Sequence, residues 1–179
     1  KEISLGKMEW GMIGPSVVAS PDQQHVAYVT SREPKQVVLR DGAAGKEYDA
    51  ILAGGMLFSP DGKRLAYGTE RNGKQVLLVD EREEPPCDGI LQGTPVFSPD
   101  SKRFIYGARR GDKWLMILDG VESKPYDGFV QGTTLFSPDS KRAAFAAGRE
   151  NRYLVVVDGK ESAEYTTIGG ENDIVFRPD

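Results

Sequence analysis

The sequence has very little cysteine and histidine and no long apolar run. The single cysteine, Cys87, excludes an intrachain disulfide and a zinc site built from a cluster of thiolates. The single histidine, His25, allows a Ser-His-Asp triad at one place only. No apolar run approaches the roughly 18 residues of a membrane-spanning helix. We therefore expect no membrane span, and few routes to catalysis or metal binding.

The sequence also has no large excess of acidic or basic residues. The 179 residues include 23 basic and 27 acidic ones, which gives a net charge of -4. This mild balance argues against a general nucleic-acid binder. The sequence also lacks a Gly-x-Ser-x-Gly elbow, a phosphate-binding loop, a dinucleotide fingerprint and a histidine-rich metal set. We accordingly expect a protein that is not an enzyme, with no catalytic residues, no metal, no cofactor and no nucleic-acid partner.

What the sequence does contain is an internal repeat, the feature that decides its architecture. The triplet Ser-Pro-Asp begins at Ser20, Ser59, Ser98 and Ser137, a constant step of 39 residues, and Arg177-Pro178-Asp179 ends the chain as a fifth copy. A second series with the same step holds Tyr48, Cys87, Tyr126 and Tyr165. Because Cys87 replaces a tyrosine in a repeated position, we expect a small buried side chain there and no reactive thiol.

Each repeat unit predicts four short β-strands. In the third unit they fall at about 95–98, 103–108, 113–119 and 124–130, where Val, Ile, Leu, Phe and Tyr dominate. Gly, Pro, Asp and Ser fill the intervening turns, and no window has the 3.6-residue apolar period of a helix. Four antiparallel strands in about 40 residues are typical of a β-propeller blade. The expected fold is therefore all-β, with four complete blades and partial strands of a fifth.

We predict a single propeller domain or propeller segment over residues 1–179. The blades fall at about 16–54, 55–93, 94–132 and 133–170, and the terminal strands at 1–15 and 171–179 are candidates to share a fifth blade. Three alternatives stay open for the ring. In the first, the chain is a fragment of a longer propeller whose other blades lie elsewhere in a longer chain. In the second, it closes as a five-bladed ring. In the third, two chains share blades in a homo-oligomer.

The stretch Phe58-Ser59-Pro60-Asp61-Gly62-Lys63, followed by the strand 65–67, resembles the WD-repeat-like propeller units of the TolB type. Residues 97–102 and 136–141 match with serine in place of glycine, whereas the first unit departs, with Ala19 for the aromatic residue and Gln23-Gln24 for Gly-Lys. The resemblance covers nearly the whole chain and implies a bacterial propeller with many conceivable functions. It also implies export to the periplasm or the cell exterior; the residues themselves leave the compartment unknown.

The turns between the second and third strands carry the candidate binding residues. They supply two cations per unit in register, and propeller geometry is expected to arrange these in an arc on one face. The loops between blades, expected on the same face, are rich in glycine and carry amide side chains. The candidate binding residues are Arg32, Arg71, Arg110, Arg149, Lys35, Lys74, Lys113, Arg152, Gln92 and Gln131. The alternative interpretation is that the cations solubilise the turns and pair with local acids such as Glu33, Glu70, Asp112 and Glu150.

These patterns favour a non-enzymatic scaffold that binds a protein or another ligand through those turns and loops. One alternative is a carbohydrate- or anion-binding propeller module of a larger secreted protein, with a polysaccharide as ligand. A third is a hydrolase or lyase whose site lies in the channel. The Ser-Pro-Asp triplet itself is expected to form a turn, because proline fixes φ and the aspartate accepts backbone hydrogen bonds. His25 takes the position held by Arg64, Arg103 and Arg142, and we expect this position to be exposed to solvent.

Overall fold

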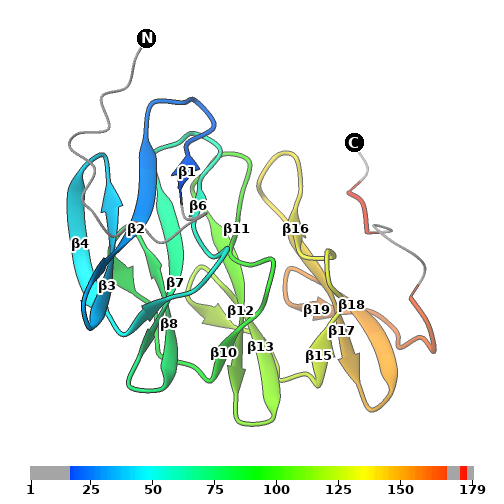
Figure 1. The fold of residues 1–179 in the computed structure, drawn as a ribbon. Coiled ribbons are helices and arrows are strands. Elements are labelled where there is room, and N and C mark those ends of the chain that lie inside the picture. Colours follow the sequence, from blue (N-terminus) through cyan, green and yellow to red (C-terminus); the bar gives the residue numbers. More distant parts are fainter. Residues whose placement is uncertain (1–16, 169–173, 177–179) are drawn as a thin grey trace. The chain divides into compact units, whose positions relative to one another are not determined.

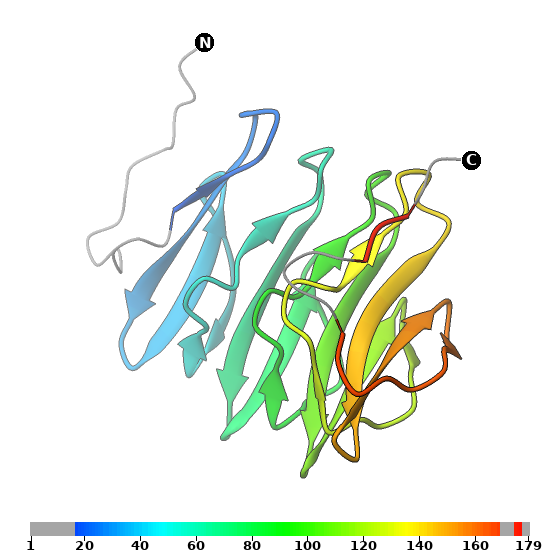
Figure 2. The same ribbon diagram turned by 90° about the vertical axis from the view of Figure 1, so that its right-hand side faces the viewer.

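The computed structural model describes residues 17–168 and 174–176, and these residues form strands, turns and loops with no helix (Figures 1 and 2). Accordingly, none of them lies in a helix that could cross a membrane. The all-β prediction is confirmed. The chain divides into two compact units, residues 1–87 and 88–179, and each unit contains two antiparallel sheets. The terminal segments proposed to share a fifth blade are 1–15 and 171–179. Of these, residues 1–15, 171–173 and 177–179 lie outside the described residues, and residues 174–176 form no strand.

Unit 1 contains the first two sheets. The strand order is β1-β2-β3-β4 in the first and β5-β7-β8-β9 in the second, where β6 also pairs with β7. The strands of the first sheet are β1 (Val18–Ala19), β2 (Val26–Arg32), β3 (Lys35–Arg40) and β4 (Ala43–Tyr48). Those of the second are β5 (Ala50–Ile51), β6 (Leu57–Phe58), β7 (Leu65–Arg71), β8 (Lys74–Val79) and β9 (Arg82–Glu83).

Unit 2 repeats the arrangement of the second sheet twice. The orders are β10-β12-β13-β14, with β11 also on β12, and β15-β17-β18-β19, with β16 also on β17 (Figure 1). The third sheet holds β10 (Gly89–Ile90), β11 (Val96–Phe97), β12 (Phe104–Arg110), β13 (Lys113–Leu118) and β14 (Val121–Glu122). The fourth holds β15 (Gly128–Phe129), β16 (Leu135–Phe136), β17 (Ala143–Arg149), β18 (Arg152–Val157) and β19 (Lys160–Glu161).

Tight turns explain why the long central strands pair as hairpins. The turn from the third to the fourth strand is Asp-Gly in three sheets, and both of its residues have positive φ, as in Asp119 (50°) and Gly120 (83°). This is the two-residue turn whose twist matches that of the flanking strands. In the second sheet the glycine position holds Glu81, at φ 63°, a backbone conformation that L side chains rarely adopt. The exception becomes important below.

Each unit has its own apolar core, formed where its two sheets pack against each other. In unit 1 the core joins Ala27, Val38 and Tyr48 of the first sheet to Leu65 and Leu78 of the second, with further residues around them. In unit 2 a matching cluster joins the third sheet to the fourth. A blade of alternating strands has two apolar faces and buries them only against neighbouring blades, which accounts for this pairing.

The prediction of one continuous outer strand at 124–130 is wrong. Tyr126 bridges to Trp114 in its own sheet, whereas β15 pairs with β17 of the next sheet. Pro125 has no N–H to donate, so the ladder of β14 is interrupted before Tyr126. The loops expected to link blades, such as 91–95, instead lie within a sheet, between β10 and β11 on the same edge of β12. Whether 1–179 is one domain or a segment of a longer propeller stays a prediction.

Candidate functional site

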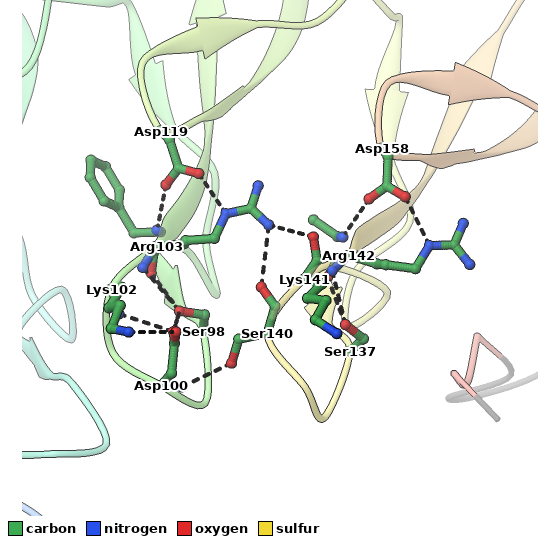
Figure 3. Close-up of polar contacts among 12 residues, drawn as sticks. Ser98, Asp100, Lys102, Arg103, Asp119, Ser137, Ser140, Lys141, Arg142 and Asp158 are labelled. Carbon is green, nitrogen blue, oxygen red and sulfur yellow. Dashed lines mark hydrogen bonds and ion pairs between the residues drawn. The ribbon is translucent and has the colours of Figure 1, made fainter. Parts of the chain in front are cut away.

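The Ser-Pro-Asp triplet forms a closed set of hydrogen bonds within each turn (Figure 3). The Ser98 hydroxyl donates to Asp100 Oδ1 over 2.6 Å and accepts the Arg103 N–H over 3.0 Å, while the Lys102 N–H reaches the same carboxylate over 3.2 Å. Ser59 with Asp61 and Ser137 with Asp139 repeat this pattern. The hydrogen bond from Ser98 holds the pKa of Asp100 below its usual range. The expectation that the triplet forms a turn agrees with these contacts.

A second aspartate in each sheet fixes the residue that follows the turn. Arg103 Nε donates to Asp119 Oδ2 over 2.7 Å, and the other carboxylate oxygen accepts the Phe104 N–H over 3.0 Å (Figure 3). Arg64 with Asp80 and Arg142 with Asp158 do the same. His25 substitutes for arginine, with Nδ1 2.7 Å from Asp41 Oδ2. His25 is thus half-buried and paired with Asp41 of the hairpin turn, whereas we expected this position to be exposed to solvent.

In unit 2 the same arginine also joins neighbouring sheets. The Arg103 guanidinium donates to the Lys141 carbonyl over 2.7 Å, and it lies over the Phe136 ring at 5.5 Å from the centroid. The Asp100 N–H donates to the Ser140 hydroxyl over 2.9 Å. In unit 1 His25 stacks on Phe58, with the ring centroids 6.5 Å apart. The polar residues of the Ser-Pro-Asp region therefore hold neighbouring blades of unit 2 together.

Two of the four candidate arginines sit in elaborate ion-pair networks. Arg71 makes a two-point contact with Glu83, at 3.2 and 2.9 Å, and the Tyr48 hydroxyl donates to the same carboxylate over 2.9 Å. Arg149 pairs with Glu161 in the same manner, and the Tyr126 hydroxyl donates to Glu161 over 2.9 Å. Lys46 and Lys124 complete the two networks.

These contacts shift the pKa of the two glutamates. The Arg149 guanidinium, helped by the Tyr126 hydroxyl, lowers the pKa of Glu161 to about 2. The Arg71 guanidinium lowers the pKa of Glu83 in the same direction. Burial, reinforced by the hydrogen bond to Glu161, raises the pKa of Tyr126. Both carboxylates are thus anions throughout the physiological pH range, matched to the arginines beside them.

The other two candidate arginines have simpler partners. Arg110 lies 2.6 Å from Glu122, and Arg32 lies 3.7 Å from Glu47. Every arginine of the predicted arc therefore has a glutamate partner, although these glutamates are not the turn acids that the alternative interpretation named. The structure brings each one to the turn between the second and third strands of its sheet, at residue 32, 71, 110 or 149.

Aspartate carboxylates accept backbone N–H groups of the turns between the second and third strands. The Asp49 carboxylate pairs with Lys35 and accepts the Asn72 N–H over 2.7 Å. In unit 2 Asp127 pairs with Lys113 over 2.5 Å and accepts the Glu150 N–H over 2.8 Å. Asp88 likewise accepts the Gly111 N–H over 2.7 Å. One carboxylate thus connects the turns of two successive sheets in each unit. Lys74 and Arg152 begin the third strands β8 and β18 and are exposed.

Gln92 and Gln131 lie in the loops between the two halves of the first edge strand, and both are exposed. The threonines of these loops have structural partners. Thr94 Oγ1 donates to the Leu91 carbonyl over 2.6 Å, and Thr133 Oγ1 donates to the Val130 carbonyl over 2.7 Å. The loops are therefore closed by their own hydroxyls, which leaves the glutamine amides at the surface.

Metal binding finds no support in the part of the chain that the structure describes. No group of three or more His, Cys, Asp or Glu side chains there could hold an ion. Cys87 is buried, and its Sγ lies 3.5 Å from the Gln75 carbonyl, in agreement with the interpretation of a small buried side chain. Sequence reasoning missed the Tyr–Glu–Arg networks, although tyrosine and glutamate recur 35 residues apart at Tyr48 and Glu83 and again at Tyr126 and Glu161.

Comparisons with known proteins bear on the fold. No family model matches the sequence, so none supports the Ser-Pro-Asp-Gly-Lys signature, and no curated protein matches it. Among solved structures, a eukaryotic initiation factor aligns with a TM-score of 0.50 and 14% identity, over 93% of this chain and 47% of that one. TolB from Acinetobacter baumannii aligns with a TM-score of 0.44 and 18% identity, over 79% of this chain and 40% of that one.

A third similar structure is the β-propeller domain of Cps50 (Swd1) from Myceliophteria thermophila, with a TM-score of 0.44 and 10% identity, over 82% of this chain and 58% of that one. The chain therefore spans between 40% and 58% of the length of these three structures. The repeated four-stranded antiparallel sheets identify the fold as one of β-propeller blades, as the repeat predicted.

Proposed function

We propose that this chain is a non-enzymatic β-propeller scaffold that binds a protein partner. The observation that carries the proposal is the fixed backbone of its turns between second and third strands. Asp49, Asp88 and Asp127 each accept a backbone N–H from such a turn, and the flanking arginines are tied to glutamates. A preorganised surface loses little conformational entropy when a partner binds, which favours affinity.

The binding surface proposed is made of these turns and the glutamine-bearing loops. Its cations are Arg32, Arg71, Arg110, Arg149, Lys35, Lys74, Lys113 and Arg152, and its amides are Gln92 and Gln131. Because glutamates partner all four arginines, the surface presents paired charges rather than an uncompensated cationic field. Paired charges suit a partner that carries both signs, as protein surfaces do, better than a polyanion.

A second candidate is a carbohydrate-binding module of a larger secreted protein. It is favoured by the exposed amides of Gln92 and Gln131, which recur at the repeat step and can both donate to and accept from sugar hydroxyls. The same surface would serve either partner, so the experiment must distinguish them.

The test compares three forms of the chain. The first is wild type, the second carries Lys74→Glu and Arg152→Glu in the turns, and the third carries Lys102→Glu and Lys141→Glu in the Ser-Pro-Asp turns as matched controls. The control side chains are 82% and 81% exposed. Partners captured from extracts of the source organism are identified by mass spectrometry and then titrated in purified form. The turn variant should bind at least about tenfold more weakly, which corresponds to roughly 1.4 kcal/mol.

Equal weakening in the turn variant and the control variant would contradict the proposed surface. A glycan array and a titration with polygalacturonate test the second candidate in parallel. Binding to a glycan that is lost in a Gln92→Ala, Gln131→Ala variant, together with no captured protein, would replace the scaffold proposal by the carbohydrate one.

A further inference from the structure

Unit 2 contains an apolar cavity of about 150 Å³ between its two sheets. The cavity lies beside the hairpins that join the third and fourth strands. Its lining residues are Ile105, Met116, Leu118, Val121, Ala143 and Phe145, with Glu122, Ser123, Asp158 and Gly159 completing the wall. Val121 is 72% exposed, so the cavity opens to solvent on that side.

The corresponding place in unit 1, two repeat lengths earlier, is built differently. Tyr67 stands where unit 2 has Phe145, and Glu81 stands where unit 2 has Gly159. The Tyr67 hydroxyl donates to Glu81 Oε1 over 2.9 Å. The Glu81 carboxylate packs over Gly45 so closely that a Cβ there would lie 2.9 Å from Oε2. A third difference is Leu65, which corresponds to the smaller Ala143.

The cavity therefore coincides with the loss of three groups from the repeat: a tyrosine hydroxyl, a carboxylate and most of a leucine side chain. Its two acidic residues are already partnered, since Asp158 pairs with Arg142 over 2.9 Å and Glu122 with Arg110 over 2.6 Å. No lining residue is a free cation that would attract an anion. An enclosed apolar cavity of this size accepts a single benzene ring, and the opening beside Val121 gives a ring access to this one.

We propose that this cavity is a binding site for a small neutral aromatic molecule, of one ring with short alkyl substituents. Burial of the ring against Ile105, Met116 and Phe145 supplies the affinity, and the carboxylates of Glu122 and Asp158 disfavour anionic ligands. The site adjoins the proposed protein-binding surface at one point, where Glu122 in its wall pairs with Arg110. It lies in unit 2 because only that unit combines phenylalanine, glycine and alanine at the three positions.

The test uses the full 179-residue chain with methyl groups of Ile, Leu, Val and Met labelled for NMR, and toluene as the probe. Saturable shifts are expected at Ile105, Met116, Leu118 and Val121, with a dissociation constant on the order of 0.1 to 1 mM. Val38 is the residue of unit 1 that corresponds to Met116. Its methyl signals serve as the internal reference and should not shift. Benzoate, which adds a negative charge to the same ring, should bind at least about tenfold more weakly because of the two carboxylates.

Two variants give unit 2 the residues of unit 1. Phe145→Tyr with Gly159→Glu, and separately Ala143→Leu, should each weaken toluene binding at least about tenfold by filling the cavity. The methyl spectrum without toluene establishes whether each variant is folded, and Ala143→Leu provides the result if the double variant is not. Absence of shifts in wild type, or equal binding by a folded variant, would overturn the proposal. Tighter binding of N-acetyl-phenylalanine amide than of toluene would also overturn it, in favour of a partner's side chain.

Discussion

In unit 1 the Tyr67 hydroxyl donates to Glu81, whereas unit 2 has Phe145 and Gly159 at the same positions of the repeat. Yet both units share the network in which a tyrosine and an arginine hold one glutamate, Tyr48 and Arg71 in one unit and Tyr126 and Arg149 in the other. The difference teaches that a repeat unit consists of two kinds of position. The positions of this tyrosine, arginine and glutamate, which join one sheet to the next, keep their polar contacts, while those beside the hairpin vary and allow a cavity to open.

The largest effect is expected where the two units are the same. Ser59→Ala in unit 1 and Ser98→Ala in unit 2 should each lower the free energy of unfolding by about 1 to 3 kcal/mol. Both serines are fully buried, and each loss leaves a buried backbone N–H without its hydroxyl acceptor. Urea denaturation measures the change. The control Lys102→Ala, on a side chain 82% exposed, should produce none. A loss of stability in only one of the two serine variants would contradict the equivalence of the Ser-Pro-Asp turns in the two units.

The next effect concerns the glutamate networks and their dependence on pH. Glu161→Gln should lower the free energy of unfolding by about 1 kcal/mol at pH 7, because the ion pair with Arg149 and the hydrogen bond from Tyr126 weaken. The pKa of Glu161 is lowered from 4.5 to about 2 in the folded chain, so its contribution is complete above about pH 5. It is lost as the pH falls from there toward 2.

Urea titrations of wild type and Glu161→Gln at several pH values test this, and the two curves should converge below pH 3. Glu122→Gln is the matched control, since Glu122 is 40% exposed and pairs with Arg110 alone, whereas Glu161 is 18% exposed. The control should lose less stability at pH 7. A difference between wild type and Glu161→Gln that stays constant from pH 7 to pH 2 would refute the stated role of the ion pair.

The architecture could be predicted from the sequence further than the site could. The 39-residue step and the Ser-Pro-Asp turns sufficed for four antiparallel sheets, because each turn is closed by residues at most five positions apart, such as Ser98 and Arg103. The crossing between sheets near Tyr126 and Asp127 was missed, since β-propensity alone does not reveal which sheet a two-residue strand joins.

The candidate cations show how far the site could be predicted from the sequence. Their recurrence was evident, and so was the presence of acids nearby, but the acids expected to pair were turn residues such as Glu70 and Glu150. The actual partners, Glu83 and Glu161, lie 12 residues after their arginines, on the fourth strand of the same sheet. The cavity of unit 2 could not be foreseen, because it depends on three substitutions within the fourth sheet acting together.

A smaller effect is expected from exchanging the aromatic residues that distinguish the units. Tyr67→Phe should lower the free energy of unfolding by about 0.5 kcal/mol, because the buried ring loses its hydrogen bond to the exposed Glu81. Phe145→Tyr alone should bring no gain, since Gly159 offers no carboxylate to accept the new hydroxyl. Thermal unfolding of both variants measures the contrast. Stabilisation by Phe145→Tyr alone would mean that Glu122, Ser123 or Asp158, which line the cavity, accepts the new hydroxyl.

The central claim is that the repeated turn arginines belong to the frame that holds the sheets. A double-mutant cycle on Arg149 and Glu161, with alanine at each position and urea unfolding as the readout, tests it most directly. The Glu161 carboxylate also accepts the Tyr126 hydroxyl, and the Arg149 and Glu161 side chains are only partly exposed. We therefore predict a coupling free energy of about 0.5 to 1 kcal/mol between Arg149 and Glu161. A coupling indistinguishable from zero would contradict it and return these arginines to the role of free ligand-binding cations.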